Sequence, residues 1–214
     1  MVRVFSLASG RVWCGIQRVE NCSADLTAAE RNCILGEPLK RVNEFSTGRV
    51  LIRTLLAKFG VMGLSVLPGR NGAPMWPEGF TGSVSHSDEY CFVTVTNCAA
   101  VSLGVDVQKV VPVTVDFTDM ILTDRERKAV AEEQYMERNV WTNMLFSAKE
   151  SVFKSLSPKM QAITDFRDVE ISFRERQFVS RIPRYGLSLN GVSILRDGYV
   201  FSGISRRVNT HFSV

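Results

Sequence analysis

The chain has 214 residues, of which 45% are hydrophobic and 22% are charged, and its formal net charge is +4. This composition is ordinary for a globular protein with a sizeable core, and it excludes a disordered or collagen-like chain. The small basic excess favours anionic partners, but it is too weak to indicate a nucleic-acid-binding protein.

Cysteine usage and apolar runs bear on the cellular compartment. The five cysteines have irregular spacing and form no C-x-x-C motif, so neither a disulfide framework nor a zinc site is expected. The most apolar stretch, residues 50–67, is interrupted by Arg53 and Lys58, and the N-terminus lacks the apolar core of a signal peptide. We therefore expect a soluble, cytoplasmic protein with no membrane span.

The first strong secondary-structure signal is a helix over residues 46–60. Its apolar residues recur at helical spacing, Ser46 or Thr47 is available as an N-cap, and Gly60 is available as a stop. The next segment, residues 67–82, is dense in glycine and proline and is expected to be a loop.

Two strands and a capped helix are predicted next. One strand is expected toward the end of residues 83–96 and another over residues 100–110, because β-branched and aromatic residues gather there. In residues 122–134, Thr123 or Asp124 can cap a helix whose first turn contains a glutamate.

The last third of the chain mixes a long helix with strands. Residues 141–156 have apolar positions at helical spacing, whereas residues 168–182 and 198–208 alternate like strands of an antiparallel sheet. Because the elements show no regular strand–helix–strand rhythm, the predicted class is α+β.

Asp106 and Gln108 are the first candidate ligands. They are two residues apart on a predicted strand, so their side chains point to the same face, while Val105 and Val107 point to the other. Two oxygen-bearing side chains on one face suit a hard cation such as Mg²⁺. The alternative is a polar strand face in contact with solvent.

Glu150 and Lys154 lie one turn apart on the predicted helix of residues 141–156. Such a pair on a helix surface contributes only about 0.2–0.5 kcal/mol, so a simple surface ion pair is one interpretation. The other is that Glu150 completes a metal site begun by Asp106 and that Lys154 meets a phosphate.

Ser85 and His86 follow the glycine- and proline-rich loop. The G-x-S-x-G motif of serine hydrolases is absent, so we favour a histidine that hydrogen-bonds a phosphate over a Ser–His nucleophile. A purely structural histidine is the alternative. The only other histidine, His211, is near the C-terminus, so a histidine-rich metal site is not expected.

Basic residues accumulate between residues 38 and 77. Arg49 and Arg53 are four residues apart and share one face of the predicted helix. This segment suggests an anion-binding surface, unless it is only a solvated helix face. Its basic residues are Lys40, Arg41, Arg49, Arg53, Lys58 and Arg70, against a single acid, Glu44.

Four motifs in this order resemble one family, the 4'-phosphopantetheinyl transferases, and in particular its enterobactin-synthase component D-like subgroup. They are KRVNEFSTGR at residues 40–49, PGRNGAPMWPEGFTGSVSHS at residues 68–87, LGVDVQ at residues 103–108 and FSAKESVFK at residues 146–154. Each motif is weak alone, but the four in this order and spacing are specific.

The resemblance implies a fold, substrates and partners. The expected fold is two pseudo-twofold-related α/β halves, residues 1–104 and 105–214, each a small antiparallel sheet with packed helices. The expected reaction transfers the 4'-phosphopantetheine group of coenzyme A to a serine of an apo acyl or peptidyl carrier protein. Mg²⁺, or Mn²⁺ in its place, is the expected cofactor, and we expect a monomer.

Carried over position by position, the resemblance also implies site residues. The expected metal ligands are Asp106, Gln108 and Glu150, and Lys154 and His86 are expected to act in catalysis with Asp106 and Glu150. Glu126 is a secondary candidate near the site. The expected coenzyme A-binding residues are Arg41, Arg49, Arg53, Arg70, Asn71, Ser85, His86, Asp106, Glu150 and Lys154, with Arg53 secondary.

One position departs from the family pattern. The family usually has an acid where this chain has Gln108, and an amide keeps an oxygen ligand but loses a charge. The base that accepts the serine proton is left open between Glu150 and a water held at the metal. Two other functions are also left open: a non-catalytic coenzyme A- or nucleotide-binding module, and a Mg²⁺-dependent phosphodiesterase.

Overall fold

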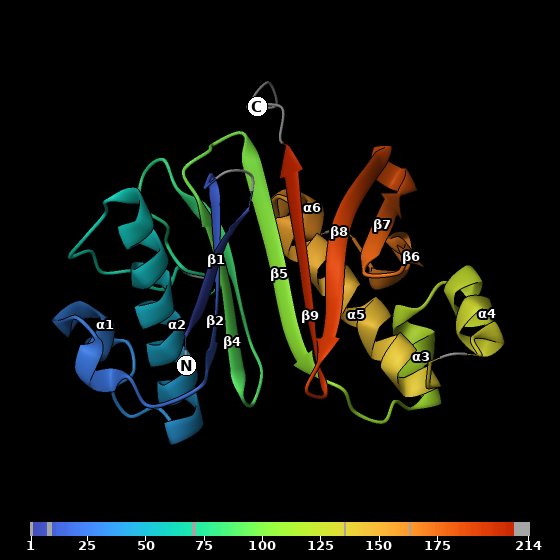
Figure 1. Ribbon diagram of the computed structural model, residues 1–214, viewed down its shortest axis with the longest axis horizontal. Helices are drawn as coiled ribbons and strands as arrows, with labels where there is room; N and C mark the ends of the chain where they lie inside the picture. The colour runs from blue at the N-terminus through green and yellow to red at the C-terminus, as the bar shows by residue number, and fades with distance from the viewer. Residues whose placement is uncertain (1, 8–9, 70–71, 135, 163, 208–214) are drawn as a thin grey trace. The chain divides into compact units, whose positions relative to one another are not determined.

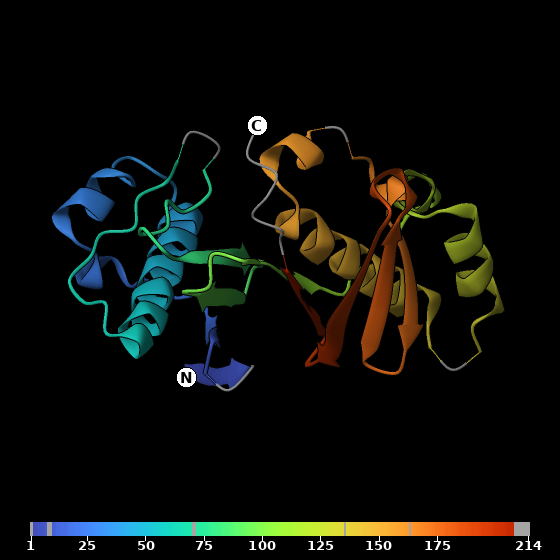
Figure 2. The same cartoon turned by 90° about the horizontal axis from the view of Figure 1, so that it is seen from above.

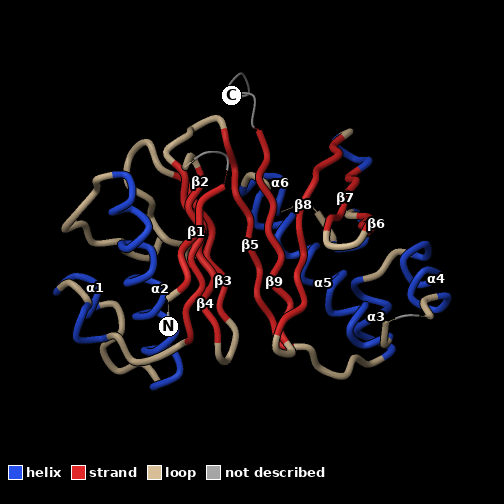
Figure 3. The backbone as a smooth tube through the Cα atoms, viewed as in Figure 1, coloured by secondary structure: helices blue, strands red, loops and turns tan. Residues whose placement is uncertain are grey.

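The structure is a computed structural model that describes residues 2–7, 10–69, 72–134, 136–162 and 164–207 (Figure 1). The chain divides into two compact units, one formed by Met1–Leu103 together with Arg207 and the other by Gly104–Arg206. Each unit combines antiparallel strands with helices (Figure 3), which confirms the predicted α+β class. The pseudo-twofold relation between the halves stays a prediction.

The first unit contains a four-stranded sheet in the order β1-β2-β4-β3, in which every neighbouring pair is antiparallel. The long helix α2 (Leu39–Leu56) packs against the central strands β2 and β4. The strands are β1 (Arg3–Leu7), β2 (Val12–Arg18), β3 (Thr81–His86) and β4 (Tyr90–Thr96). The hairpin of β1 and β2 was not predicted from the sequence.

Helix α2 begins at Leu39, so the predicted start at Ser46 or Thr47 is wrong. Both hydroxyl side chains are buried inside the helix and bind the preceding segment instead of capping. Thr47 Oγ1 accepts a hydrogen bond from the backbone N–H of Glu20, and Ser46 Oγ accepts one from the backbone N–H of Cys22. Their polarity serves a tertiary contact, which local sequence cannot reveal.

The end of α2 follows the prediction. A 3₁₀ turn, Ala57–Phe59, continues the helix, and Gly60 then adopts a φ of 81°, which is the left-handed conformation that favours glycine. The core beneath α2 is formed by Leu51, Ile52, Leu55, Leu56, Val66, Cys91, Val93 and Val95. A short helix, α1 (Ala28–Asn32), precedes α2.

The second unit contains a five-stranded sheet in the order β5-β9-β8-β7-β6 (Figure 1). The pairs from β6 through β9 are antiparallel. The strands are β5 (Val101–Lys109), β6 (Glu170–Arg174), β7 (Gln177–Ile182), β8 (Leu187–Arg196) and β9 (Tyr199–Arg207). Strand β8 was not predicted.

Among the described residues of this unit there are four α-helices, and the longest, α5, runs along one face of its sheet (Figure 2). The predicted capping residue Thr123 is confirmed, because its side chain accepts a hydrogen bond from the backbone N–H of Glu126. The helices are α3 (Val115–Ile121), α4 (Asp124–Glu132), α5 (Arg138–Ser155) and α6 (Pro158–Gln161).

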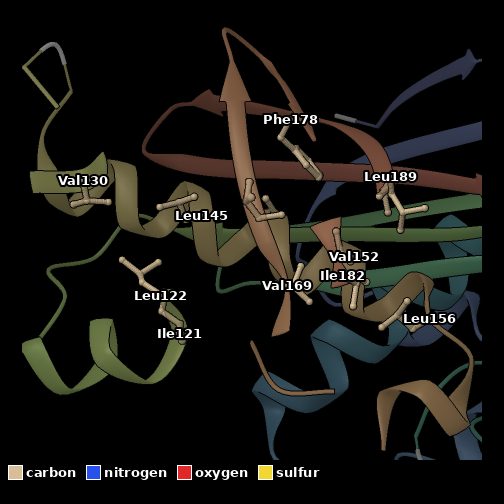
Figure 4. Packing of buried hydrophobic residues seen from close by; sticks show 13 residues of the cluster. Ile121, Leu122, Val130, Leu145, Val152, Leu156, Val169, Phe178, Ile182 and Leu189 are labelled. Carbon is tan, nitrogen blue, oxygen red and sulfur yellow. The ribbon is translucent and has the colours of Figure 1, made fainter. Parts of the chain in front are cut away.

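The core of the second unit lies between α5 and the sheet (Figure 4). Leu145, Val152 and Leu156 on the helix side pack with Phe178 and Ile182 of β7. Each of these side chains is at most 4% exposed. Within the described part of the chain, no helix combines the length and apolar character that crossing a bilayer requires.

Candidate functional site

Three ionisable side chains meet where β5 lies against α5. Lys154 Nζ is 2.8 Å from Asp106 Oδ1 and 3.9 Å from Glu150 Oε2. Asp106 is 5% exposed, whereas the side chains of Glu150 and Lys154 are 26% and 29% exposed. The cluster is therefore buried on the strand side and partly open on the helix side. The structure brings these three predicted residues together.

Gly104 allows β5 and α5 to approach this closely. A Cβ at this position would lie 1.8 Å from the carbonyl oxygen of Ser151, which no real side chain tolerates. Because side chains alternate along a strand, Asp106 and Gln108 face the same side as Gly104, toward α5. The glycine thus places Asp106 against the helical turn that carries Lys154.

Gln108 ties the other end of this strand segment to the same helix. Its Nε2 donates a hydrogen bond of 2.6 Å to the backbone carbonyl oxygen of Asn143. A carbonyl oxygen can only accept, so the amide nitrogen must face the helix and Oε1 is the atom that could bind a cation. The role of Gln108 as a metal ligand stays a prediction.

Glu150 is the member of the cluster with a perturbed pKa. Burial raises the pKa of this carboxyl, the nearby Lys154 ammonium opposes the rise, and the like charge of Asp106 adds to it. A second cation beside Glu150 would oppose the rise of its pKa in the same way that Lys154 does.

The oxygen atoms of this cluster could hold a magnesium ion only together with ligands from outside the chain, such as phosphates. Within the described ranges, no group of three or more His, Cys, Asp or Glu side chains could hold a metal ion. Magnesium commonly takes only one or two protein carboxylates and completes its shell with water and substrate phosphates. Asp106, Glu150 and Oε1 of Gln108 would be its ligands.

In the first unit, Arg49 is a buried cation on α2. The residue is 4% exposed, and its guanidinium lies over the ring of Phe45 at 4.3 Å from the ring centroid. Its Nε is buried without a hydrogen-bond partner, and no carboxylate of the described residues forms an ion pair with it. Burial lowers the pKa of Arg49 to about 10. A buried guanidinium of this kind is well suited to bind an anion.

Other predicted anion-binding residues lie in the same unit. Arg41 is on α2, with its guanidinium 5.9 Å from the centroid of the Phe45 ring that also contacts Arg49. Ser85 is 6% exposed, and His86 is the last residue of β3. The two remaining predictions, Arg70 and Asn71, lie outside the described residues.

Unlike Arg49, Arg53 has a carboxylate partner among the described residues, although the two arginines lie one turn apart on α2. Its guanidinium forms an ion pair with the fully buried carboxylate of Glu30 and donates to the backbone carbonyl of Asp25. Glu30 also accepts from the backbone N–H of Val66 at 2.9 Å. These contacts favour a structural role for Arg53, and its expected part in donor binding is untested.

Glu126 is held in the same manner in the second unit. It completes the capping box with Thr123, accepts from the backbone N–H of Ile171 at 2.7 Å, and lies 2.7 Å from Lys149 Nζ. Lys149 is fully buried and also donates to two backbone carbonyls, those of Ile121 and Phe166. Burial lowers the pKa of Lys149, and Glu126 opposes that change. These contacts favour a structural role for Glu126.

Sequence reasoning missed the repeat that these two glutamates reveal. The motif L-T-x-x-E-R occurs at residues 26–31 and again at residues 122–127. The same offset along the chain relates Arg53 to Lys149, the cations that bind the two glutamates. Comparison of the chain with itself at this offset would have shown the repeat.

Sequence reasoning also missed Glu44, whose carboxylate contacts His86 in the structure.

Comparisons with known proteins identify the family. Residues 29–96 match the 4'-phosphopantetheinyl transferase N-terminal domain, and residues 102–194 match the 4'-phosphopantetheinyl transferase superfamily. The 4'-phosphopantetheinyl transferase Svp of Streptomyces mobaraensis is 38% identical over 135 residues, which cover 62% of this chain and 55% of that relative.

Two further relatives support the same assignment. The 4'-phosphopantetheinyl transferase PptT of Mycobacterium tuberculosis is 33% identical over 159 residues, which cover 71% of this chain and 70% of that relative. Enterobactin synthase component D of Salmonella typhi is 27% identical over 123 residues, which cover 56% of this chain and 50% of that relative. The chain thus spans about half the length of the Streptomyces and Salmonella relatives that it matches. The chain belongs to the 4'-phosphopantetheinyl transferase family.

Proposed function

We propose that this protein transfers the 4'-phosphopantetheine group of coenzyme A to a serine of an apo acyl or peptidyl carrier protein, with release of adenosine 3',5'-bisphosphate. Family membership supports this activity, and the enterobactin synthase relative supports a carrier of siderophore or non-ribosomal peptide synthesis. A carrier of polyketide synthesis is assigned only by the family resemblance. The single observation that carries the proposal is the cluster of Asp106, Glu150 and Lys154, because it offers both cation ligands and a phosphate-binding ammonium.

The first unit would hold the donor through its phosphates. Arg49 supports this assignment most strongly, because its guanidinium is buried and lacks a carboxylate partner among the described residues. Arg41 shares the Phe45 ring with it, and Ser85 and His86 lie at the end of β3. Arg70 and Asn71 are assigned to the donor only by the family resemblance.

The second unit would hold the pyrophosphate and the metal. A magnesium ion bound to Asp106 and Glu150 would neutralise negative charge on the pyrophosphate oxygens. The Lys154 ammonium, already 2.8 Å from Asp106, would lie close enough to contact the same phosphates. Gln108 would assist through Oε1 and would not be essential.

The reaction joins the serine oxygen to the β-phosphorus and breaks the bond from that phosphorus to the leaving adenosine bisphosphate. Negative charge grows on the phosphoryl oxygens and on the leaving group, and Lys154 and His86 would stabilise it. The serine proton would pass to Glu150, which is the carboxylate on the partly open side of the cluster, or to a water molecule there.

The activity is tested by weighing an apo-carrier protein after incubation with this protein, coenzyme A and Mg²⁺. A mass gain of one phosphopantetheine group is expected, and a chelator should abolish it. Asp106→Ala and Glu150→Ala should each lose most of the turnover and remain folded. An unchanged mass across a panel of carriers would favour a non-catalytic coenzyme A-binding module, and cleavage of coenzyme A without transfer would favour a phosphodiesterase.

We also propose that the enzyme works as a monomer in the cytoplasm. All five cysteines are free thiols, and those at positions 14, 22 and 91 are buried, which supports a reducing compartment. Size-exclusion chromatography with light scattering tests the monomer, and a mass that corresponds to a dimer would contradict it.

A further inference from the structure

Glu44 contacts the histidine that is expected to meet the donor. Glu44 lies on α2, and its Oε2 is 3.6 Å from Nδ1 of His86 at the end of β3. The Glu44 side chain is 12% exposed and that of His86 is 36% exposed, so the carboxylate is the buried member of the pair. Neither the metal site nor the anion-binding arginines use Glu44.

The fold fixes this contact through matched spacing along α2 and β3. Lys40, one turn before Glu44, forms an ion pair of 2.7 Å with Asp88, which is two residues beyond His86. Gly48, one turn after Glu44, packs against β3 and β4. Four helical residues rise about 6 Å and two strand residues span about 6.6 Å, so the helix and the strand stay in step. Glu44 is therefore placed opposite His86 by the packing of two long elements.

The charges around this pair favour a protonated imidazole. A carboxylate that is largely removed from water needs a compensating positive charge, and the ion-pair partner of Glu44 among the described residues is His86. Lys40 is exposed and bound to Asp88, so it compensates Glu44 only weakly. Cys91 lies opposite His86 in the sheet, and burial raises its pKa to about 12, so that thiol is neutral.

We propose that Glu44 is a positioning residue, which holds His86 by Nδ1 in its charged form so that Nε2–H is presented to a phosphate of the donor. The two nitrogens lie on opposite edges of the ring, so a partner on Nδ1 directs Nε2 away from α2. This inference rests on the proposed function, because it assigns the anion to coenzyme A.

The first test measures the pKa of His86 in the ligand-free protein by NMR. The chain has only two histidines, and the spectrum of His86→Gln identifies the His86 signal. Glu44→Gln keeps the shape of the side chain and removes its charge, and it should lower the pKa of His86, because an opposite charge beside the imidazole is lost. An unchanged pKa would overturn the inference, whether or not the protein is a transferase.

The second test measures the dissociation constant of coenzyme A at two pH values. At about pH 7.5, Glu44→Gln should raise the dissociation constant several-fold, because a smaller fraction of its imidazole carries a charge there. At about pH 5.5, where both proteins carry a charged imidazole, the two dissociation constants should converge. An equal loss at both pH values would indicate a merely structural role and would overturn the inference.

Two controls separate this role from others. Lys40→Gln breaks the neighbouring ion pair between the same two elements and should leave the pKa of His86 and the shape of the pH profile unchanged. In a His86→Gln background, Glu44→Gln should cause no further pH-dependent loss, because the two residues act as a unit. Additive losses would overturn the inference. Failure of the unchanged protein to bind coenzyme A would instead count against the proposed function.

Discussion

The two units attach a short capped helix to a long helix through the same device. In the first, Glu30 completes the capping box of α1 and binds Arg53 of α2; in the second, Glu126 completes the capping box of α4 and binds Lys149 of α5. Each glutamate also accepts a backbone N–H from a segment beyond its long helix. The same separation along the chain relates the two glutamates and the two cations, so both units contain this device at corresponding positions.

The units differ in the charges that lie beside the shared device. One turn before Arg53, α2 carries Arg49, a buried cation without a carboxylate partner in the described chain. Directly after Lys149, α5 carries Glu150, which lies near Asp106. On the proposed function, the same scaffold would support an anion-binding face in one unit and a cation-binding face in the other. We therefore expect the repeated pairs to matter mainly for stability and the positions where the repeats diverge to matter mainly for activity.

The largest expected effect comes from breaking the repeated ion pair in the second unit. Glu126→Ala leaves Lys149 buried without its counter-charge and should lower the free energy of unfolding by about 3–5 kcal/mol. Glu30→Ala should cost less, because the Arg53 side chain is 20% exposed whereas that of Lys149 is fully buried. Urea denaturation measures both, with the exposed Glu132→Ala as a near-neutral control. A larger loss for Glu30→Ala than for Glu126→Ala would contradict this ranking by burial.

A second comparison concerns the glycines beneath the two long helices. Gly104→Ala should cost about 1–3 kcal/mol or more, because the new Cβ meets rigid backbone of α5. Gly15→Ala in the first unit should cost less, since its Cβ would meet the Leu51 side chain, at 2.7 Å, and that side chain can rotate. Thermal denaturation of the two variants ranks them. Equal costs would mean that the close contact of β5 and α5 is not rigid.

The cation-binding face is tested by removing the cation that the chain itself supplies. Lys154→Met should tighten the binding of Mn²⁺ without coenzyme A by about fivefold to tenfold, because the ammonium no longer competes for Asp106. Lys154→Arg keeps the charge and should differ little from the unchanged protein. The electron paramagnetic resonance signal of free Mn²⁺ measures each dissociation constant. Weaker binding in Lys154→Met would contradict this account of the cluster.

The smallest expected effect is on the pH dependence of stability. Because burial raises the pKa of Glu150, the native state binds more protons than the unfolded state between the ordinary and the raised value. The contribution of Glu150 to stability is therefore complete at low pH and is lost as the pH rises through the raised pKa. Glu150→Gln should gain stability relative to the unchanged protein across that window. Urea denaturation at a series of pH values measures this difference. If Glu150→Gln loses stability relative to the unchanged protein as the pH rises, the predicted sign is wrong.

Local patterns predicted those parts of the fold that depend on local chemistry. The α+β class follows from hydrophobic periodicity, the Thr123 cap from the side chain that an N-cap requires, and the stop at Gly60 from the left-handed backbone that glycine adopts readily. The structure confirms all three. The start of α2 was predicted wrongly, because Ser46 and Thr47 resemble caps but bind a segment more than twenty residues earlier in the chain. Tertiary contacts of this kind leave no local signal.

The candidate site shows the same limit. Family motifs pointed to Asp106, Glu150 and Lys154, and the structure brings them together. Helical spacing placed Arg49 and Arg53 on one face, but it could not show that a buried acid of α1, Glu30, binds only the second of them. Such distinctions depend on which distant side chains share a buried environment.

The division of charge between the two units is tested most directly by titrating coenzyme A calorimetrically, with and without Mg²⁺. The account predicts that the unchanged protein binds coenzyme A more tightly with Mg²⁺. Arg49→Gln should weaken binding by about tenfold or more in both conditions, because a charge-assisted contact is lost. Asp106→Asn should lose only the gain that Mg²⁺ provides. Unchanged binding in Arg49→Gln, or the full Mg²⁺ gain in Asp106→Asn, would contradict the account.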